Sequence, residues 1–248
     1  MSDCNDRASW LKGGQAQCSI PAKPRARPPR FVLLGAPGVG KGTQAALLCA
    51  GMGVCQLSTG DIFRASKCLS EGERSPAMTE ALSYMKRGEL VPDSTVLNLI
   101  RERVRCLNCK GGFLLDGFPR TQPQAEALNE LLEDNLIRLD AVLNYTLPIP
   151  TIVERLSGRR TCANCKAVFH VSALPPKVSD VCDHCGGALI QREDDRPEAI
   201  EVRMLAYETS TKPLIDFYAE HGLLRTISAA GTPDQIYERT MAILDNVI

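Results

Sequence analysis

Residues 30–44 read RFVLLGAPGVGKGTQ, an apolar run that ends directly in a glycine-rich stretch. The run from Arg30 to Leu34 is short and continuously apolar after its first residue, which is typical of a strand buried in a parallel sheet. The following glycines permit a sharp turn, and the stretch from Lys41 to Gly53 predicts a helix closed by glycine. The segment therefore predicts a strand, a tight loop and a helix in direct succession.

The predicted loop has the composition of a phosphate cradle. Gly38, Gly40 and Gly42 let successive backbone N–H groups point at phosphate oxygens, at the positive end of the helix. Lys41 adds a mobile positive charge. The usual P-loop pattern, G-x-x-x-x-G-K-[ST], has a hydroxyl after the lysine, whereas here Gly42 follows and Thr43 comes one position late. This indicates that magnesium is held more by phosphates and water than by the protein. The alternative, a glycine-rich turn with a solvated lysine, is disfavoured because the loop directly follows an apolar strand.

Composition limits the class of protein. The chain has 248 residues, 44% of them hydrophobic and 23% charged, with a formal net charge of zero. A neutral chain is a poor candidate for a dedicated nucleic-acid binder, and no apolar run approaches the roughly 20 residues of a membrane helix. We expect an intracellular protein, cytoplasmic by default. Eleven cysteines, four of them in two C-x-x-C pairs with the spacing of metal ligands, favour a reducing compartment and one metal site over a disulfide framework.

Residues 1–29 form a basic, Pro-rich N-terminal extension. The first 30 residues carry six Lys or Arg against two Asp, and they lack the apolar region of a secretory signal. Three interpretations stay open: a disordered tail, a segment that targets or tethers the chain to an organelle, or a folded arm. We exclude this extension from the predicted fold.

The rest of the chain alternates between strand and helix patterns. Further apolar runs at 54–58, 111–118, 139–147 and 222–228 predict four more strands. Helical patterns lie between them, including 93–104, 121–132 and a long one from Pro197 toward His221 that Pro213 bends. This alternation predicts an α/β fold with a doubly wound five-stranded parallel sheet, whose ligands gather at the carboxyl ends of the strands.

Two segments interrupt the alternation and read as insertions. Residues 59–91 have helical patterns only, and residues 158–195 are rich in Cys, Pro and Gly. The core is therefore expected to comprise 30–58, 92–157 and 196–248.

Two further motifs follow predicted strands. LSTGDIFR at 57–64 carries Thr59 and Arg64, and LLDGFPRTQPQ at 114–124 carries Asp116, Arg120 and Gln124. Arginines aimed at one pocket suit the binding of phosphates, and an amide can bond the edge of a base. Taken singly, each side chain could be an ordinary surface residue. Their combination at the carboxyl ends of two successive predicted strands indicates a site for two nucleotides.

In order and spacing, six motifs resemble those of adenylate kinases of the long form with a large lid. They are the glycine loop, STGD, GELV at 88–91, FLLDGFPRT at 113–121, SGRR at 157–160 and GT at 231–232. The resemblance covers roughly residues 31–248. It implies reversible transfer of a phosphoryl group between ATP and AMP to give two ADP, with Mg²⁺ and a monomeric enzyme. It also implies that 59–91 binds the monophosphate and that 158–195 is the lid.

The resemblance assigns site residues one by one. For the ATP site these are Gly38, Val39, Gly40, Lys41, Gly42, Thr43, Arg155, Arg159, Val168, Phe169 and Pro233. For the AMP site they are Thr59, Arg64, Glu89, Leu90, Val91, Gly117, Phe118, Pro119, Arg120, Gln124, Arg192 and Arg203. The residues that stabilise the transferred phosphoryl group are Lys41, Arg120, Arg159, Arg192 and Arg203.

Carboxylates complete the implied site. Asp116 matches an acid that orients the waters of magnesium, and Asp194 and Asp195 are placed to orient the arginines. At Pro233 the family often has lysine or a similar residue, whose backbone carbonyl touches adenine, and this contact survives the change to proline. The chemistry needs in-line positioning, charge stabilisation and exclusion of water by mobile insertions, but no general base.

CANC at 162–165 and CDHC at 182–185 are separated by 16 residues. This is the C-x2-C-x15–20-C-x2-C spacing of a zinc site, here with the ligands Cys162, Cys165, Cys182 and Cys185. Four thiolates leave no open position, so the predicted zinc is structural, and it would staple a segment too small to hold a core. Iron or a redox pair is the alternative. A third C-x-x-C, Cys106 and Cys109, has no matching pair and is interpreted as a helix end and loop rather than a redox site.

Other functions stay open at this point. The closest is another nucleoside monophosphate kinase, of the UMP/CMP type or dependent on GTP; by the resemblance, Thr59 and Gln124 favour AMP. A zinc-ribbon ATPase that binds nucleic acid is disfavoured by the neutral charge and by the scarcity of aromatic residues in 158–195. An inactive scaffold is disfavoured because every matched motif residue is present.

Overall fold

The computed structural model describes residues 27–60, 62, 76–86, 89–101 and 107–247. The expectations for the N-terminal extension before residue 27, for Arg64 and for Cys106 lie outside these residues.

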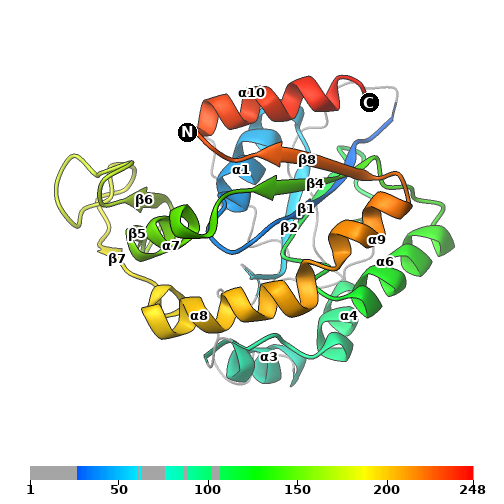
Figure 1. The fold of residues 1–248 in the computed structure, drawn as a ribbon, viewed down its shortest axis with the longest axis horizontal. Helices are drawn as coiled ribbons and strands as arrows, with labels where there is room; N and C mark the ends of the chain where they lie inside the picture. Colours follow the sequence, from blue (N-terminus) through cyan, green and yellow to red (C-terminus); the bar gives the residue numbers. More distant parts are fainter. Residues whose placement is uncertain (1–26, 61, 63–75, 87–88, 102–106, 248) are drawn as a thin grey trace.

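A five-stranded parallel sheet forms the centre of the fold, in the order β2-β3-β1-β4-β8 (Figure 1). β2 and β3 lie on one side of β1, and β4 and β8 lie on the other, as a doubly wound sheet requires, so the predicted fold class is confirmed. The strands are β1 (Arg30–Leu34), β2 (Cys55–Ser58), β3 (Phe113–Asp116), β4 (Ala141–Thr146) and β8 (Leu224–Ser228).

Alternation along β1 divides the core into two layers. Phe31 and Leu33 pack with one set of helices, whereas Val32 and Leu34 pack with another. Figure 1 shows α1 and α10 on one face of the sheet and α4, α6 and α9 on the other. No described helix is long and apolar enough to cross a bilayer. The helices are α1 (Lys41–Met52), α3 (Pro76–Lys86), α4 (Asp93–Arg101), α6 (Gln122–Asp134), α7 (Ile149–Ser157), α8 (Pro197–Ala206), α9 (Leu214–Glu220) and α10 (Pro233–Leu244).

The long helical pattern after Pro197 is interrupted earlier than predicted. The interruption begins at Tyr207, in a π-helical turn, η4 (Tyr207–Thr211), that separates α8 from α9. Lys212 N–H donates to the Tyr207 carbonyl at 2.8 Å, one residue farther back than in an α-helix. Pro213 has no N–H and its ring crowds the preceding turn, which explains why the helix widens just before it.

Residues 158–195 form a separate small sheet beyond α7, at the left of Figure 1. Its strands are antiparallel in the order β6-β5-β7, and the sequence predictions contained no strands here. Its buried cluster consists of Cys162, Phe169, Cys182 and Leu189, all from the segment itself. A core this small agrees with the expectation that the segment needs a further link to hold it together. The elements are β5 (Arg159–Cys162), β6 (Val168–His170), β7 (Leu189–Ile190) and the 3₁₀ turn η3 (Glu193–Asp195).

Candidate functional site

The glycine loop lies between β1 and α1. At three of its positions the backbone conformation requires glycine. Gly35, Gly38 and Gly40 have φ angles of 133°, 84° and 100°, where side chains are strained. At Gly38 a Cβ atom would also lie 2.7 Å from Leu156 Cγ. The loop therefore keeps its shape only with glycine at these positions.

The expectation that Gly42, like Gly38 and Gly40, is needed for the backbone to turn is not met. It belongs to α1, its φ is not positive, and a Cβ atom there would meet only Asp116 Oδ2, at 3.9 Å. Backbone and space would both accept a side chain at Gly42. The missing hydroxyl of the P-loop pattern is therefore not imposed by the geometry of the loop.

Lys41 begins α1 and turns back over the loop. Its Nζ donates to the carbonyls of Gly35 at 2.6 Å and Ala36 at 3.0 Å. Burial of the ammonium group lowers its pKa from 10.5 to about 8; Asp116 opposes this shift, and the positive charges of Arg120, Arg203 and Arg159 add to it. These groups therefore all lie within electrostatic reach of Lys41, although they come from separate parts of the chain.

The lowered pKa of Lys41 predicts proton uptake when a polyphosphate binds. At pH 9 the free protein holds Lys41 largely neutral, and bound phosphates would return its pKa toward 10.5. Calorimetric titration with MgATP at pH 9, in two buffers of different ionisation enthalpy, is expected to report uptake of up to about one proton. A Lys41→Arg variant should take up none, because a guanidinium keeps its proton. Equal uptake by both proteins would contradict this assignment.

The lowered pKa of Lys41 also makes the stability of the fold depend on pH. The folded protein holds the Lys41 proton more weakly than the unfolded chain, whose lysine pKa is near 10.5. The unfolded chain therefore binds more protons between about pH 8 and 10.5, and this group's contribution to the unfolding free energy rises with pH over that window.

Strand register brings two motifs together beside the loop. Ser58 of β2 and Leu33 of β1 both pair with Asp116 of β3, so these strands end at the same level. Asp116 Oδ2 accepts from Gln56 Nε2 of β2 at 3.2 Å. The sequence analysis did not single out Gln56, and only its position two residues before Ser58 on an adjacent strand could have suggested the contact.

Thr59 and Arg120 meet at Gly117. The carbonyl of Gly117 accepts from Thr59 Oγ1 at 3.0 Å and from Arg120 Nε at 2.8 Å. Gly117 has a φ of 82°, and a Cβ atom there would lie 3.1 Å from both side chains. Thr211 of η4 donates to the Arg120 carbonyl at 2.9 Å, a second supporting contact that the sequence analysis did not identify.

Gln124 lies in the first turn of α6 and is only 2% exposed. Its Nε2 donates to Asp93 Oδ1 at 2.7 Å, and its Oε1 accepts from the Arg120 N–H at 2.8 Å. Thr121, which caps α6, donates to the other oxygen of Asp93 at 2.9 Å. Asp93 was predicted only as part of a helix start, because nothing in the sequence indicates that α4 faces the beginning of α6.

Two acidic residues of η3 bind three arginines. Asp195 is fully buried and accepts from Arg159 Nε and Nη2 at 2.7 and 2.5 Å. Asp194 accepts from Arg192 Nε and Nη2, both at 2.9 Å. Arg203 of α8 donates to the Asp194 carbonyl at 2.6 Å and lies 3.2 Å from Asp195 Oδ1. Although burial alone would raise it, Arg203 and Arg192 hold the pKa of Asp194 well below its usual range. The expected pairing of Asp194 and Asp195 with these arginines is present.

The remaining residues assigned to ATP come from three segments. Arg155 of α7 donates to the carbonyls of Val39 at 3.4 Å and Ala229 at 3.1 Å, and so joins the glycine loop to the end of β8. Pro233 begins α10, and its carbonyl accepts from the buried Gln44 Nε2 at 2.8 Å. If this carbonyl contacts adenine, as expected from the sequence, it must accept from adenine and from Gln44 at the same time. Val168 is exposed on β6, and its neighbour Phe169 is buried.

Glu89, Leu90 and Val91, which the resemblance assigns to the AMP site, lie at the end of the 59–91 segment. Glu89 is exposed, Leu90 is half-buried and Val91 is buried. Phe118 is buried and Pro119 follows it through a cis peptide bond. Arg64, assigned to the same site, lies outside the described residues.

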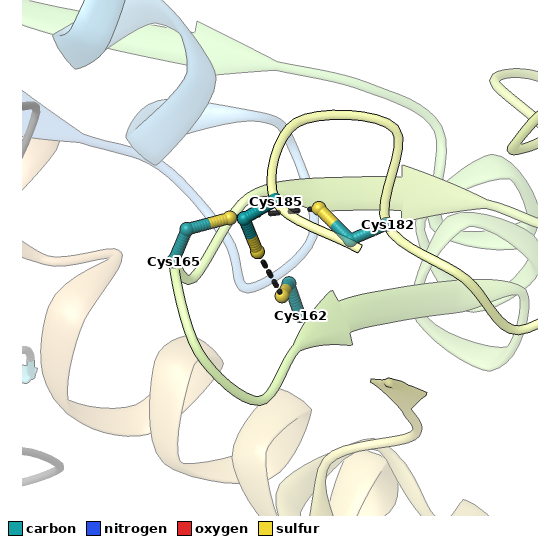
Figure 2. A group of neighbouring side chains, drawn as sticks. All are labelled: Cys162, Cys165, Cys182 and Cys185. Atoms are coloured by element: carbon teal, nitrogen blue, oxygen red, sulfur yellow. Dashed lines mark hydrogen bonds between the residues drawn. The ribbon is translucent and has the colours of Figure 1, made fainter. Parts of the chain in front are cut away.

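The four cysteines of residues 158–195 converge, and Figure 2 shows their sulfur atoms turned toward one another. All ligand atoms lie within 4.8 Å, with Cys162–Cys185 and Cys165–Cys182 sulfur distances of 3.5 Å. Four sulfurs at about 2.3 Å from one zinc ion would stand about 3.8 Å apart in a tetrahedron. The arrangement thus fits a metal ion of this size.

The two C-x-x-C turns have the same hydrogen bonds. Cys162 N–H donates to Ala167 and Cys182 N–H to Gly187, and the Cys162 and Cys182 carbonyls accept from residues four positions on. Burial would raise the pKa of the Cys162 thiol, but backbone N–H groups of Cys165 and Asn164 and the neighbouring thiols lower it, whereas burial and the neighbouring thiols raise the pKa of Cys165. A thiolate is the form that binds a metal.

Of the C-x-x-C pair formed by Cys106 and Cys109, the structure describes only Cys109. Cys109 Sγ lies 3.3 Å from Cys55 Sγ, at the opposite end of β2 from Ser58. Because Cys106 lies outside the described residues, the interpretation of this pair as structural stays a prediction.

Comparisons with known proteins agree with this geometry. A family model described as adenylate kinase matches residues 33–223. An adenylate kinase of Thermodesulfovibrio yellowstonii is 46% identical over 216 residues, which cover 87% of this chain and 99% of that protein. An adenylate kinase of Syntrophobacter fumaroxidans is 47% identical over 214 residues, covering 86% and 99%. An adenylate kinase of Archaeoglobus fulgidus is 42% identical over 217 residues, covering 88% and 98%. The family match and these similarities, which agree with the glycine loop found between β1 and α1, show that the chain belongs to the adenylate kinase family.

Proposed function

We propose that this chain catalyses reversible phosphoryl transfer between ATP and AMP, giving two ADP. One observation carries the proposal beyond family membership. Arg120, Arg159 and Arg203, from three other segments, each act electrostatically on Lys41, and among the described charges that shift its pKa three are positive and Asp116 is negative. Such an excess of positive charge suits two polyanionic substrates placed end to end.

The donor triphosphate would bind at the glycine loop. Backbone N–H groups at the start of α1 would face the phosphates, and Lys41 would exchange the Gly35 and Ala36 carbonyls for phosphate oxygens. Arg155 would support the loop from α7, and Pro233 with Val168 and Phe169 would contribute to the adenine side. Residues 158–195, as a lid, would close over this site and exclude water.

The acceptor would bind at the ends of β2 and β3. Thr59, Gly117 and Arg120 form one contact group there, and Gln124 would meet the base. Residues 59–91 would cover the acceptor, with Glu89 to Val91 lining it, while 30–58, 92–157 and 196–248 form the core. Arg159, Arg192 and Arg203, held by Asp194 and Asp195, would stabilise the phosphoryl group in flight.

Two metals are part of the proposal. Magnesium bound to ATP neutralises developing charge on the phosphates, and Asp116, held by Gln56 beside Gly42, fits a residue that orients its waters. Zinc at the four cysteines would have a structural role. We also propose a monomer, because the chain supplies both insertions needed to complete its own site.

Initial rates of ADP formation from MgATP with AMP, CMP, UMP or GMP, each supplied alone, test this proposal. AMP is expected to be the only efficient acceptor, and GTP in place of ATP tests the donor. Arg120→Ala should lower kcat/KM for AMP about 100-fold, since it removes a charged contact to phosphate, whereas the exposed Arg138→Ala should not. Transfer to pyrimidine acceptors would overturn the assignment of AMP, and no transfer to any acceptor by the zinc-loaded protein would overturn the kinase itself.

A further inference from the structure

The amide of Gln124 is held from both ends by groups of opposite character. Its Nε2 donates to the Asp93 carboxylate at 2.7 Å, and an ionised carboxylate can only accept. Its Oε1 accepts from the Arg120 backbone N–H at 2.8 Å, and this group can only donate. If the amide turned over, oxygen would face oxygen and N–H would face N–H. The two partners therefore define the orientation of this amide by chemistry.

Asp93 is itself held in place. Its Oδ1 accepts from Gln124, while its Oδ2 accepts from Thr121 Oγ1 at 2.9 Å. Thr121 Oγ1 in turn accepts from the Gln124 N–H at 3.3 Å, as the cap of α6. Rotation of the carboxylate would break one of its two contacts. Asp93, which begins α4, thus joins the start of one helix to the start of another.

A locked amide can read only one pattern on a base. Of the two N–H donors and two lone pairs of Gln124, one of each is used by Asp93 and Arg120, which leaves one of each for a ligand. A 6-aminopurine presents an amino donor and a ring-nitrogen acceptor, whereas a 6-oxopurine presents the reverse. An amide that could turn over would pair with both edges. A fixed one pairs with one of them, and the mismatch leaves buried polar groups without partners.

We propose that Asp93 determines the base specificity of the acceptor site by fixing the orientation of the Gln124 amide. Asp93 is a positioning residue, since it acts through Gln124. The inference rests on the proposed function, in which the base of the acceptor monophosphate meets Gln124, and it extends that function to the selection of 6-aminopurine over 6-oxopurine monophosphates.

The test compares AMP with IMP as acceptors, in separate measurements of kcat and KM with saturating MgATP. Asp93→Asn keeps the size and the helix-starting ability of the residue but can donate as well as accept, so it no longer excludes the turned-over amide and leaves the Arg120 N–H as the one remaining group described here that opposes it. We expect the ratio of kcat/KM for IMP to that for AMP to rise about 10-fold or more, mainly through KM. Glu126→Gln is the matched control. It makes the same chemical change on the exposed side of α6, where the Glu126 carboxylate accepts from Gln122 Nε2 of its own helix, and it should leave the ratio unchanged.

The outcomes separate the inference from the function on which it rests. If Asp93→Asn lowers kcat/KM for both acceptors by the same factor, Asp93 has only a structural role and the inference is wrong. If Gln124→Ala leaves the ratio at the value of the unmodified protein, the base does not meet Gln124 and the proposed acceptor site is wrong. Asp93→Ser, which also begins helices well, repeats the measurement if the asparagine variant does not fold. An unchanged ratio in a folded serine variant likewise overturns the inference.

Discussion

Replacing Lys41 by alanine is expected to lower kcat by about 10²- to 10³-fold, because it removes a positive charge from the path of the transferred phosphoryl group. In the free protein Lys41 bonds only to carbonyls of its own loop, among the contacts described, so its charge is available to a substrate. Initial rates with saturating MgATP and AMP measure the effect. A kcat within a factor of ten of the unmodified protein would contradict the role assigned to Lys41.

Stability should change little in the same variant. The lowered pKa of Lys41 means that the fold disfavours its charged form, so alanine removes a buried charge along with its two hydrogen bonds. We expect the melting temperature at pH 7 to stay close to that of the unmodified protein or to rise. Lys110→Ala, at an exposed position of the loop before β3, is the matched control and should affect neither quantity.

Loss of the metal site is expected to unfold residues 158–195 while the parallel sheet stays folded. Structural zinc contributes on the order of 10–16 kcal/mol in small modules, and the buried cluster of this segment includes two of the ligands, Cys162 and Cys182. Cys182→Ser should therefore abolish zinc binding and open the segment to proteases. Because Arg159 lies on β5, kcat should fall by about 10²-fold or more.

Metal analysis, limited proteolysis and kcat test this prediction together. Cys49→Ser, on α1 and outside the cluster, is the matched control and should keep one zinc per chain. Retention of one zinc and full activity by Cys182→Ser would contradict the structural role. Iron in place of zinc in the isolated protein would correct the identity of the metal.

Much of the central fold follows from local patterns. The apolar run before the glycine loop predicts β1 with its observed ends, because a strand buried on both faces needs continuous apolar residues and glycine stops it. The cysteine spacing likewise predicts the cluster, since a C-x-x-C turn places two sulfurs side by side. In both cases the residues that determine the structure are close together in the sequence.

Features that depend on distant residues could not be predicted in this way. The contact between Asp93 and Gln124 joins residues 31 positions apart on two helices, and no local pattern encodes the angle between those helices. The strands of residues 158–195 lack alternation because their burial is limited to a few positions around the cysteines. The π-helical turn before Pro213 also escaped prediction, because proline indicates a break but not the direction in which the helix adjusts.

The self-contained core of residues 158–195 also bears on how this architecture can vary. Its buried residues contact one another, and the cluster includes none from the five-stranded sheet. Substitutions within that cluster are therefore free of packing constraints from the sheet, and substitutions in the sheet are free of constraints from the cluster. We therefore expect that the segment between α7 and η3 can be replaced by one that is stabilised differently, for example by a metal-free hydrogen-bonded core, without redesign of the sheet. The condition for such a replacement is that Arg159, Asp194 and Asp195 at the two ends of the segment are kept, since Asp195 holds Arg159 and Asp194 holds Arg192, and both arginines belong to the proposed site.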